Sequence, residues 1–467
     1  MINIKEEAPF ELQRFPYPYR AAFTVASDID SANIARFRAI HSLFCRPELI
    51  PQDSPEWRTL GLSPGCPRFD PERRGVRGLG LEFADSFFLI GDPTTIGMYR
   101  SSPQKDCFLE DEQDGENGLV LFRQWIKEGQ IDSFHAFLHY KRSQVEPLLR
   151  DFYEWCERCN VTKPKVWINH SAAVTPSGLC PDKLQPNRLY SLSRLAARGL
   201  VGPLFGRKRF PLRYAFVRYD GDTPGSPYYV NDLLAENGLR YVWLNMHDLH
   251  ENRIALPEHG QNGRETILQA VRMDDGVRYW RFNRCYGSPP GRVSGLYLRD
   301  SKEGIDSSHL ITEPNLLELC RVHGTCILAT HWTHHRSLPL SSETIGRFDL
   351  LRQWSEAGKI WVTSTVRLLE WTRLRTFLEI SCRREGDRLI IEIGDVNDPI
   401  FGRQSLELKD LHGVCIRLKE PEAPVTIAVK GQVLSPAQLC RGGGMWWMDT
   451  KAVSDRLPMG QRPETRC

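Results

Sequence analysis

Short apolar segments alternate with amphipathic segments along most of the chain, and this alternation restricts the possible folds more than any other feature. The apolar segments cover residues 20–27, 83–90, 165–170, 239–245, 324–331 and 360–364. Between them apolar residues recur at helical spacing, as over residues 143–159. The order of strand, polar loop and helix recurs about seven or eight times, which predicts a parallel α/β barrel. An open dinucleotide-binding sheet is less well supported, because no Gly-x-Gly-x-x-Gly follows the first strand.

The sequence predicts three parts. A polar N-terminal arm covers residues 1–19, and the (β/α) barrel covers residues 20–372. After residue 375 the apolar runs become shorter and follow one another at hairpin spacing, which indicates a small antiparallel β module over residues 375–454 that should own its core. Residues 46–78 are rich in Pro, Gly and Arg without periodicity, so they are expected to form a long loop.

Composition sets limits on partners and location. The chain of 467 residues has 41% apolar residues and a net charge of only +3, so a globular core is expected and nucleic acid is not an expected partner. The N-terminus lacks the apolar region of a signal peptide, and no apolar run approaches the ~18 residues of a membrane span. The 13 scattered cysteines suit free thiols in a reducing compartment, so the cytoplasm is the expected location.

Polar residues stand where the predicted barrel strands end. Asp28 and Asp30 follow the first strand, Asn169 and His170 end a middle strand, and His331 ends a late one. The carboxyl ends of barrel strands meet on one rim, so these side chains are expected to converge. For the two acids, the alternative is that they cap the helix expected to begin near residue 32.

His135 and His139 form a further candidate pair, four residues apart. On a strand they would lie ~13 Å apart, too far for one metal ion. On a helical turn their Cβ atoms would lie ~6 Å apart, which suits two ligands of one ion. Metal binding therefore requires a helical turn at His135, before a helix whose start carries the capping-box pattern of residues 143–146. The alternative is a pair of ordinary histidines near a strand end.

Two histidines and a carboxylate make a three-ligand site that leaves a position for water. The metal would lower the pKa of that water, a second carboxylate would take its proton, and a histidine would protonate the leaving amine. Asp28, Asp30 and His331 can supply the remaining groups. The same ligand set occurs in iron oxygenases, so it does not define the reaction by itself.

Three short segments together resemble the polysaccharide deacetylase superfamily over residues 20–372. They are Ser27-Asp-Ile-Asp30, His135-Ala-Phe-Leu-His139 and Leu328-Ala-Thr-His331, in the order of that family's motifs. The resemblance implies a deformed barrel of about seven parallel strands. Residues 219–230 resemble a branch of deacetylase-like proteins associated with bacterial surface polysaccharides.

The resemblance also implies roles for individual residues. Asp28 would be the base, His331 the acid, and Asp30, His135 and His139 the ligands of a divalent metal, with zinc expected. The family's two acids are adjacent, whereas one residue, Ile29, separates them here, so the reverse assignment of base and ligand stays open. Ala136 also replaces the family's usual hydroxyl residue, and the last segment has one extra residue.

The sequence therefore predicts a metal-dependent hydrolase that removes N-acetyl groups from a polysaccharide or a sugar precursor. Asn169, His170 and Trp243 are the predicted substrate contacts, since an aromatic ring can stack on a sugar, although packing is the alternative for Trp243. A glycoside hydrolase on a related barrel is a second possibility and would need two carboxylates on either side of the glycosidic bond. A degenerate barrel that only binds glycans is a third.

Overall fold

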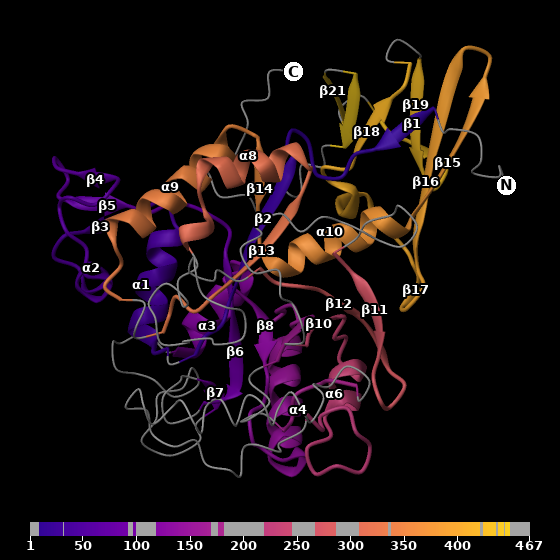
Figure 1. The fold of residues 1–467 in the computed structure, drawn as a ribbon. Helices are drawn as coiled ribbons and strands as arrows, with labels where there is room; N and C mark the ends of the chain where they lie inside the picture. The colour runs from indigo at the N-terminus through magenta and orange to yellow at the C-terminus, as the bar shows by residue number, and fades with distance from the viewer. Residues whose placement is uncertain are drawn as a thin grey trace, which may run out of the picture.

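The computed structural model shows one large sheet flanked by helices, with smaller β-sheets beside it (Figure 1). It describes residues 9–30, 32–91, 97–99, 118–169, 176–181, 219–244, 267–285, 308–334, 338–420, 424–435, 438–442 and 444–448. No helix in these ranges is long and apolar enough to cross a membrane.

Within the described residues, ten strands form the large sheet. In spatial order its main path runs through β11 (Gln269–Arg272), β12 (Arg278–Arg281), β10 (Tyr241–Trp243), β9 (Val166–Ile168), β8 (Ile131–His135), β6 (Ala84–Ile90), β2 (Ala21–Ser27) and β13 (Thr325–Thr330). In addition β14 (Ile360–Val362) pairs with β2, and β7 (Gly97–Tyr99) pairs with β6. Among these described pairs, all are parallel except β11 with β12.

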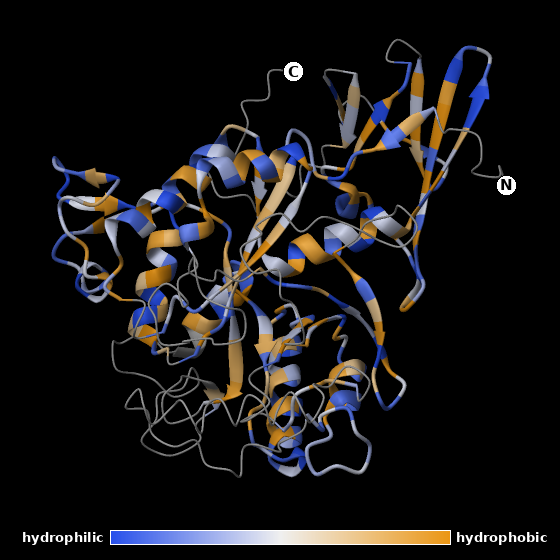
Figure 2. Cartoon of the chain, viewed as in Figure 1, coloured by the Kyte–Doolittle hydropathy of each residue, from blue (hydrophilic) through white to orange (hydrophobic). Residues whose placement is uncertain are grey.

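The central strands of this mainly parallel sheet are buried, as is usual for parallel strands covered on both faces. Every residue of β2, β6, β8 and β13 is buried. The helices are α1 (Ile34–Phe44), α2 (Pro55–Leu60), α3 (Gly118–Lys127), α4 (Arg142–Arg158), α6 (Asn231–Glu236), α8 (Glu313–Arg321), α9 (Ser342–Glu356) and α10 (Thr365–Phe377), with 3₁₀ turns at Ser308–Leu310 and Leu408–Leu411. Helix α4 packs on β6, and α10 packs on β2 and β8. Figure 2 shows the consequence, a hydrophobic β6 beside helices that mix hydrophobic and hydrophilic residues.

A short contact joins β13, at one end of the sheet path, to the segment that follows β12. Cys285 forms an isolated parallel bridge with Leu328 of β13. The backbone N–H of Cys285 donates to the carbonyl of Ile327 at 2.7 Å, and the N–H of Ala329 donates to the carbonyl of Cys285 at 2.9 Å. Since β12 itself pairs with β10, the segment from β12 to Cys285 contacts both β10 and β13.

Most described residues of the predicted C-terminal β module lie in two small sheets. One contains β15 (Leu378–Glu385), β16 (Arg388–Asp398), β17 (Gly402–Gln404), β19 (Val425–Val429) and β20 (Gln432–Val433), and the other contains β1 (Phe10–Leu12), β18 (Cys415–Leu418), β22 (Met445–Met448) and β21 (Leu439–Gly442). The expectation of purely antiparallel pairing is wrong for β16 and β19, which are parallel. Strand β1 comes from the predicted N-terminal arm, so both ends of the chain contribute to the module.

The module and the large sheet share one hydrophobic cluster. Trp243 and Trp280 from the sheet belong to the same cluster as Ile391 and Leu418 from the module. The indole N–H of Trp280 also donates to the Asp398 carboxylate at 3.1 Å. Helix α10 runs across the predicted boundary at residue 375, and β15 follows it directly.

Two local predictions are corrected. Residues 46–78 are not an irregular loop, because they contain α2 and a three-stranded sheet of β3 (Leu49–Pro51), β5 (Gly75–Arg77) and β4 (Phe69–Asp70). Helix α4 begins at Arg142 rather than Ser143. The Gln144 side chain caps the first turn by accepting from the Lys141 backbone N–H at 3.0 Å. Glu146, the expected capping residue, forms an ion pair with Arg142.

Candidate functional site

Four of the predicted site residues meet at the carboxyl ends of parallel strands. Asp28 and Asp30 follow β2, His135 is the last residue of β8, and His331 follows β13. The strands β2 and β13 are neighbours, and β6 lies between β2 and β8. The backbone N–H of Asp28 donates to the carbonyl of Thr330 at 2.8 Å, so the ends of β2 and β13 remain in register up to the site.

These four side chains form a continuous polar series. His331 Nε2 lies 3.5 Å from Asp28 Oδ2 and 3.6 Å from Asp30 Oδ2, and His135 Nε2 lies 3.3 Å from Asp30 Oδ1. The side chains of Asp28 and His135 are 6% and 0% exposed, whereas those of Asp30 and His331 are 23% and 20% exposed. A substrate arriving from solvent would therefore meet Asp30 and His331 first.

The two acids of the site are separated in the sequence by one residue, Ile29. Ile29 is fully buried in the hydrophobic core. Both carboxylates nevertheless lie near one nitrogen, since His331 Nε2 is 3.5 Å from Asp28 and 3.6 Å from Asp30.

Arg284 is a central residue of the site that sequence reasoning missed. Its Nη1 and Nη2 donate to the two carboxylate oxygens of Asp28 at 2.6 and 3.1 Å, in the bidentate arrangement that a guanidinium favours. Its guanidinium carbon lies 3.5 Å from the ring centroid of Trp243, so the ion pair is covered by an aromatic face. The arginine side chain is 0% exposed.

This pairing keeps Asp28 ionised. Burial alone would raise the pKa of Asp28, but the positive charge of Arg284, with contributions from His135 and His331, outweighs burial and lowers the pKa below its usual value. At neutral pH the candidate site therefore contains a buried carboxylate whose charge is balanced by a buried guanidinium. No local signal in the sequence marks Arg284, because its partner is 256 residues away.

His135 is held in one orientation. Its Nδ1 lies 3.1 Å from the carbonyl oxygen of Ile168, which can only accept a hydrogen bond, so Nδ1 carries the proton. Its ring packs beside Phe88, with ring centroids 4.6 Å apart. The Nε2 atom is thereby directed at Asp30 and is the nitrogen available for chemistry or for a metal.

His139 lies differently from the sequence expectation. The helical turn expected at His135 is absent: β8 ends there, and a turn at residues 138–139 with Leu138 at φ +56° precedes α4. The His139 side chain is exposed and stacks on Tyr140, with ring centroids 4.6 Å apart.

Of the three residues predicted to contact substrate, the structure describes Asn169 and Trp243. The Asn169 side chain is buried, accepts from the Trp167 indole at 2.7 Å and donates to the Leu179 carbonyl at 2.6 Å, so its amide supports the loop after β9. Trp243 ends β10 and presents one ring face to Arg284. His170 lies outside the described residues.

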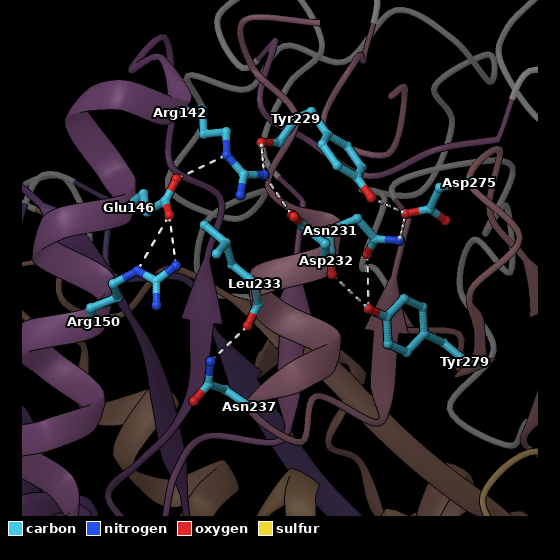
Figure 3. A network of polar contacts seen from close by, with 10 residues as sticks. All are labelled: Arg142, Glu146, Arg150, Tyr229, Asn231, Asp232, Leu233, Asn237, Asp275 and Tyr279. Atoms are coloured by element: carbon cyan, nitrogen blue, oxygen red, sulfur yellow. Dashed lines mark hydrogen bonds and ion pairs between the residues drawn. The ribbon is translucent and has the colours of Figure 1, made fainter. Parts of the chain in front are cut away.

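A polar network fixes the elements that deliver Trp243 and Arg284 (Figure 3). At the start of α4, Arg142 donates to Asp232 of α6 at 2.7 Å and to the Tyr229 carbonyl at 3.1 Å. A second group of contacts in the network joins α6 to the β11–β12 hairpin. Asn231 donates to Asp275 at 2.8 Å and accepts from the Tyr279 hydroxyl at 2.8 Å. Helix α6 leads into β10, which ends in Trp243, and β12 leads towards Arg284, so the network connects the elements that precede these two residues.

The donor set fits a divalent metal in part. Asp30 oxygen and His135 Nε2 are ligand types that zinc accepts, and they already face one another. His139 does not join them in this arrangement. Among the described residues, no group of three His, Cys, Asp or Glu side chains is arranged to hold a metal ion. His139 would complete the predicted ligand set only if the turn at residues 138–139 brought it inward.

Comparisons with known proteins do not add an assignment. No protein-family model matches the sequence, and no curated protein matches it significantly.

Proposed function

We propose that the protein is a hydrolase that removes an N-acetyl group from a polysaccharide or its sugar precursor. The observation that carries the proposal is the meeting of Asp28, Asp30, His135 and His331 at one edge of the sheet, at 3.3–3.6 Å from one another along the series. These are the four groups that the resemblance to polysaccharide deacetylases predicts at such a site, together with His139.

Each residue has a role that its environment supports. Asp28 is ionised and held by two hydrogen bonds from Arg284, so it can orient a water molecule and accept its proton. Its low pKa makes it a weak base, so correct positioning has to contribute much of the effect. His331 is partly exposed and contacts both acids, which suits a proton donor to the leaving amine.

Zinc is the proposed cofactor, held by Asp30 and His135 with His139 as the third ligand. When bound, it would lower the pKa of a coordinated water and stabilise negative charge on the carbonyl oxygen. The hydrogen bond that His135 Nδ1 donates to the Ile168 carbonyl fixes the ring so that Nε2 faces Asp30, the orientation that this role requires.

A deformed (β/α) barrel is the proposed architecture for the large sheet. The segment from β12 to Cys285 pairs with β10 on one side and with β13 on the other. These contacts support closure of the sheet, because a barrel has no free edge. Closure would bring Arg284, from that segment, to Asp28 on β2.

The glycoside hydrolase alternative is less well supported. Such enzymes need carboxylates on opposite sides of the scissile bond. Asp28 and Asp30 both lie within 3.6 Å of one nitrogen of His331, so they approach from the same side. A barrel that binds glycans without hydrolysing them is favoured by one observation, the exposed position of His139.

Acetate release from N-acetylated oligosaccharides, with and without added zinc, tests the proposal. Asp28→Asn should keep bound zinc and lose about 10²–10⁴-fold in turnover, whereas Asp30→Asn should lose both. Asp395→Asn, in the module, is the matched control and should leave turnover unchanged. Wild-type protein that holds zinc and binds glycans but releases no acetate would contradict hydrolysis and favour the binding function.

A further inference from the structure

A second cluster of reactive groups lies away from the candidate site, at the end of α1. His41 Nδ1 lies 3.2 Å from Cys45 Sγ, and His41 Nε2 lies 2.7 Å from Asp85 Oδ2. The four-residue spacing places His41 and Cys45 on one face of the helix end. Asp85 and Phe88 point to opposite faces of β6, and Phe88 is the ring that packs on His135. The cluster is thus separated from the candidate site by the sheet.

The cluster places a thiol, an imidazole and a carboxylate in contact one after another, from Cys45 through His41 to Asp85. His41 and Asp85 are 3% and 1% exposed, whereas Cys45 is partly exposed. Asp85 Oδ1 is buried and has no hydrogen-bond donor among the described residues, so His41 is the described group that balances this carboxylate's charge. Phe37 stacks on the imidazole at 4.1 Å and shields it from water.

These contacts favour a positively charged imidazole. Burial would lower the pKa of His41, but Cys45 and Asp85 outweigh burial and raise the pKa to about 9. An imidazolium beside a sulfur favours the thiolate, which is the nucleophilic form of cysteine. Among the described residues, the Asp132 carboxylate interacts with Asp85, and burial raises the pKa of Asp132 to about 6. Arg46, next to Cys45 in sequence, pairs with Glu128 at the surface. Cys45 Sγ also lies 3.6 Å from the Phe83 carbonyl, an acceptor for the thiol form.

We propose that Cys45 is a reactive thiol that hydroperoxides oxidise to a sulfenic acid. The thiolate sulfur attacks the terminal oxygen, the S–O bond forms and the O–O bond breaks. Sulfur is oxidised by two electrons, and the peroxide is reduced to water or an alcohol after taking a proton from His41. The His41–Asp85 pair supports this step by stabilising the thiolate before attack and by donating the proton to the leaving oxygen.

Alkylation of the full-length protein by iodoacetamide, followed by peptide mass spectrometry, tests the thiolate. Cys382, a partly exposed cysteine on β15, is the internal reference. Cys45 should react at pH 6 at least tenfold faster than Cys382, because, of these two cysteines, Cys45 has the His41–Asp85 pair beside its sulfur. Equal rates at the two cysteines in the wild-type protein would overturn the proposal without any variant.

Two variants and a trapping reaction test the relay. Asp85→Asn should slow alkylation of Cys45 at pH 6 about tenfold and leave Cys382 unchanged, with circular dichroism confirming the fold. Brief hydrogen peroxide treatment followed by dimedone should label Cys45 in the wild type and not in Cys45→Ser. Should Asp85→Asn fail to fold, His41→Gln provides the same comparison. A folded variant with unchanged Cys45 reactivity, or dimedone labelling spread equally over the cysteines, would show that the cluster only stabilises the helix end.

Discussion

Replacing Arg284 by methionine tests whether the buried ion pair holds the candidate site together. Methionine keeps much of the length of the arginine side chain and can still contact the Trp243 ring, so the main loss is the charge and its two hydrogen bonds to Asp28. Removing one partner of a buried pair leaves the other charge uncompensated. The free energy of unfolding should therefore fall by about 3–5 kcal/mol.

A double-mutant cycle separates this coupling from simple loss of packing. Asp28→Asn alone should also destabilise the protein, because it removes the negative charge that balances the buried guanidinium. The double variant should be far less destabilised than the sum of the two single variants, with a coupling energy of about 2–3 kcal/mol. Urea midpoints, compared at a shared denaturant slope, provide the measurement. Arg321→Met, in an exposed pair with Glu318 on α8, is the control and should leave the midpoint unchanged.

The same cycle has a defined pH dependence. The folded-state pKa of Asp28 is lower than usual, so the pair contributes its stability above the unfolded-state pKa of about 3.9, and this contribution is lost as the pH falls through the folded value. The difference between wild type and Arg284→Met should thus be largest near pH 7 and shrink in acid. Additive single variants at pH 7, or a difference that grows in acid, would refute the reasoning.

Three further predictions concern the metal, the domain boundary and a second buried acid. Replacing His135 and His139 together by alanine should abolish bound zinc in elemental analysis, and stoichiometric metal in that variant would contradict the site. Ending the chain after Arg373 should make the remainder insoluble or lower its melting temperature, because Arg373 pairs with Asp398 and the core cluster crosses this boundary; an unchanged melting temperature would show that the module is independent. Burial raises the pKa of Asp132 to about 6, so the native state binds more protons than the unfolded chain between about pH 4 and 6, and stability should fall with rising pH in that window. Asp132→Asn should remove this part of the pH dependence of the urea midpoint.

The strand-end part of the site could be predicted from the sequence. Asp28, Asp30, His135 and His331 each follow or end an apolar run, and the carboxyl ends of parallel strands lie at one edge of the sheet. This inference needs only the alternation of strands and helices. The structure confirms the mixed α/β class and the parallel pairing of these strands.

The positions of Arg284 and His139 could not be predicted in the same way. Arg284 meets Asp28 only because the segment after β12 reaches β13, a long-range pairing that no local pattern encodes. His139 depends on a non-helical turn in which Leu138 adopts a positive φ, whereas its four-residue spacing from His135 suits a helix equally well. Likewise, the sequence places residues 10–12 in a polar arm, because their strand pairing with β18 is a long-range contact that the local sequence does not indicate.

The chemistry of the two acids depends on these long-range contacts more than on the short segment that contains them. The sequence Asp-Ile-Asp allows either acid to be the base, and both carboxylates lie near His331 while Ile29 between them is buried. What distinguishes them is the surroundings: Asp28 is buried against a guanidinium, and Asp30 is partly exposed and faces His135 Nε2. Arg284 already donates to both oxygens of Asp28 and balances its charge, whereas Asp30 faces a histidine nitrogen. Asp30 is consequently the acid better placed to bind a metal. In the proposed hydrolase, Asp28 is then the acid that positions the water, although the sequence alone treats the two residues alike.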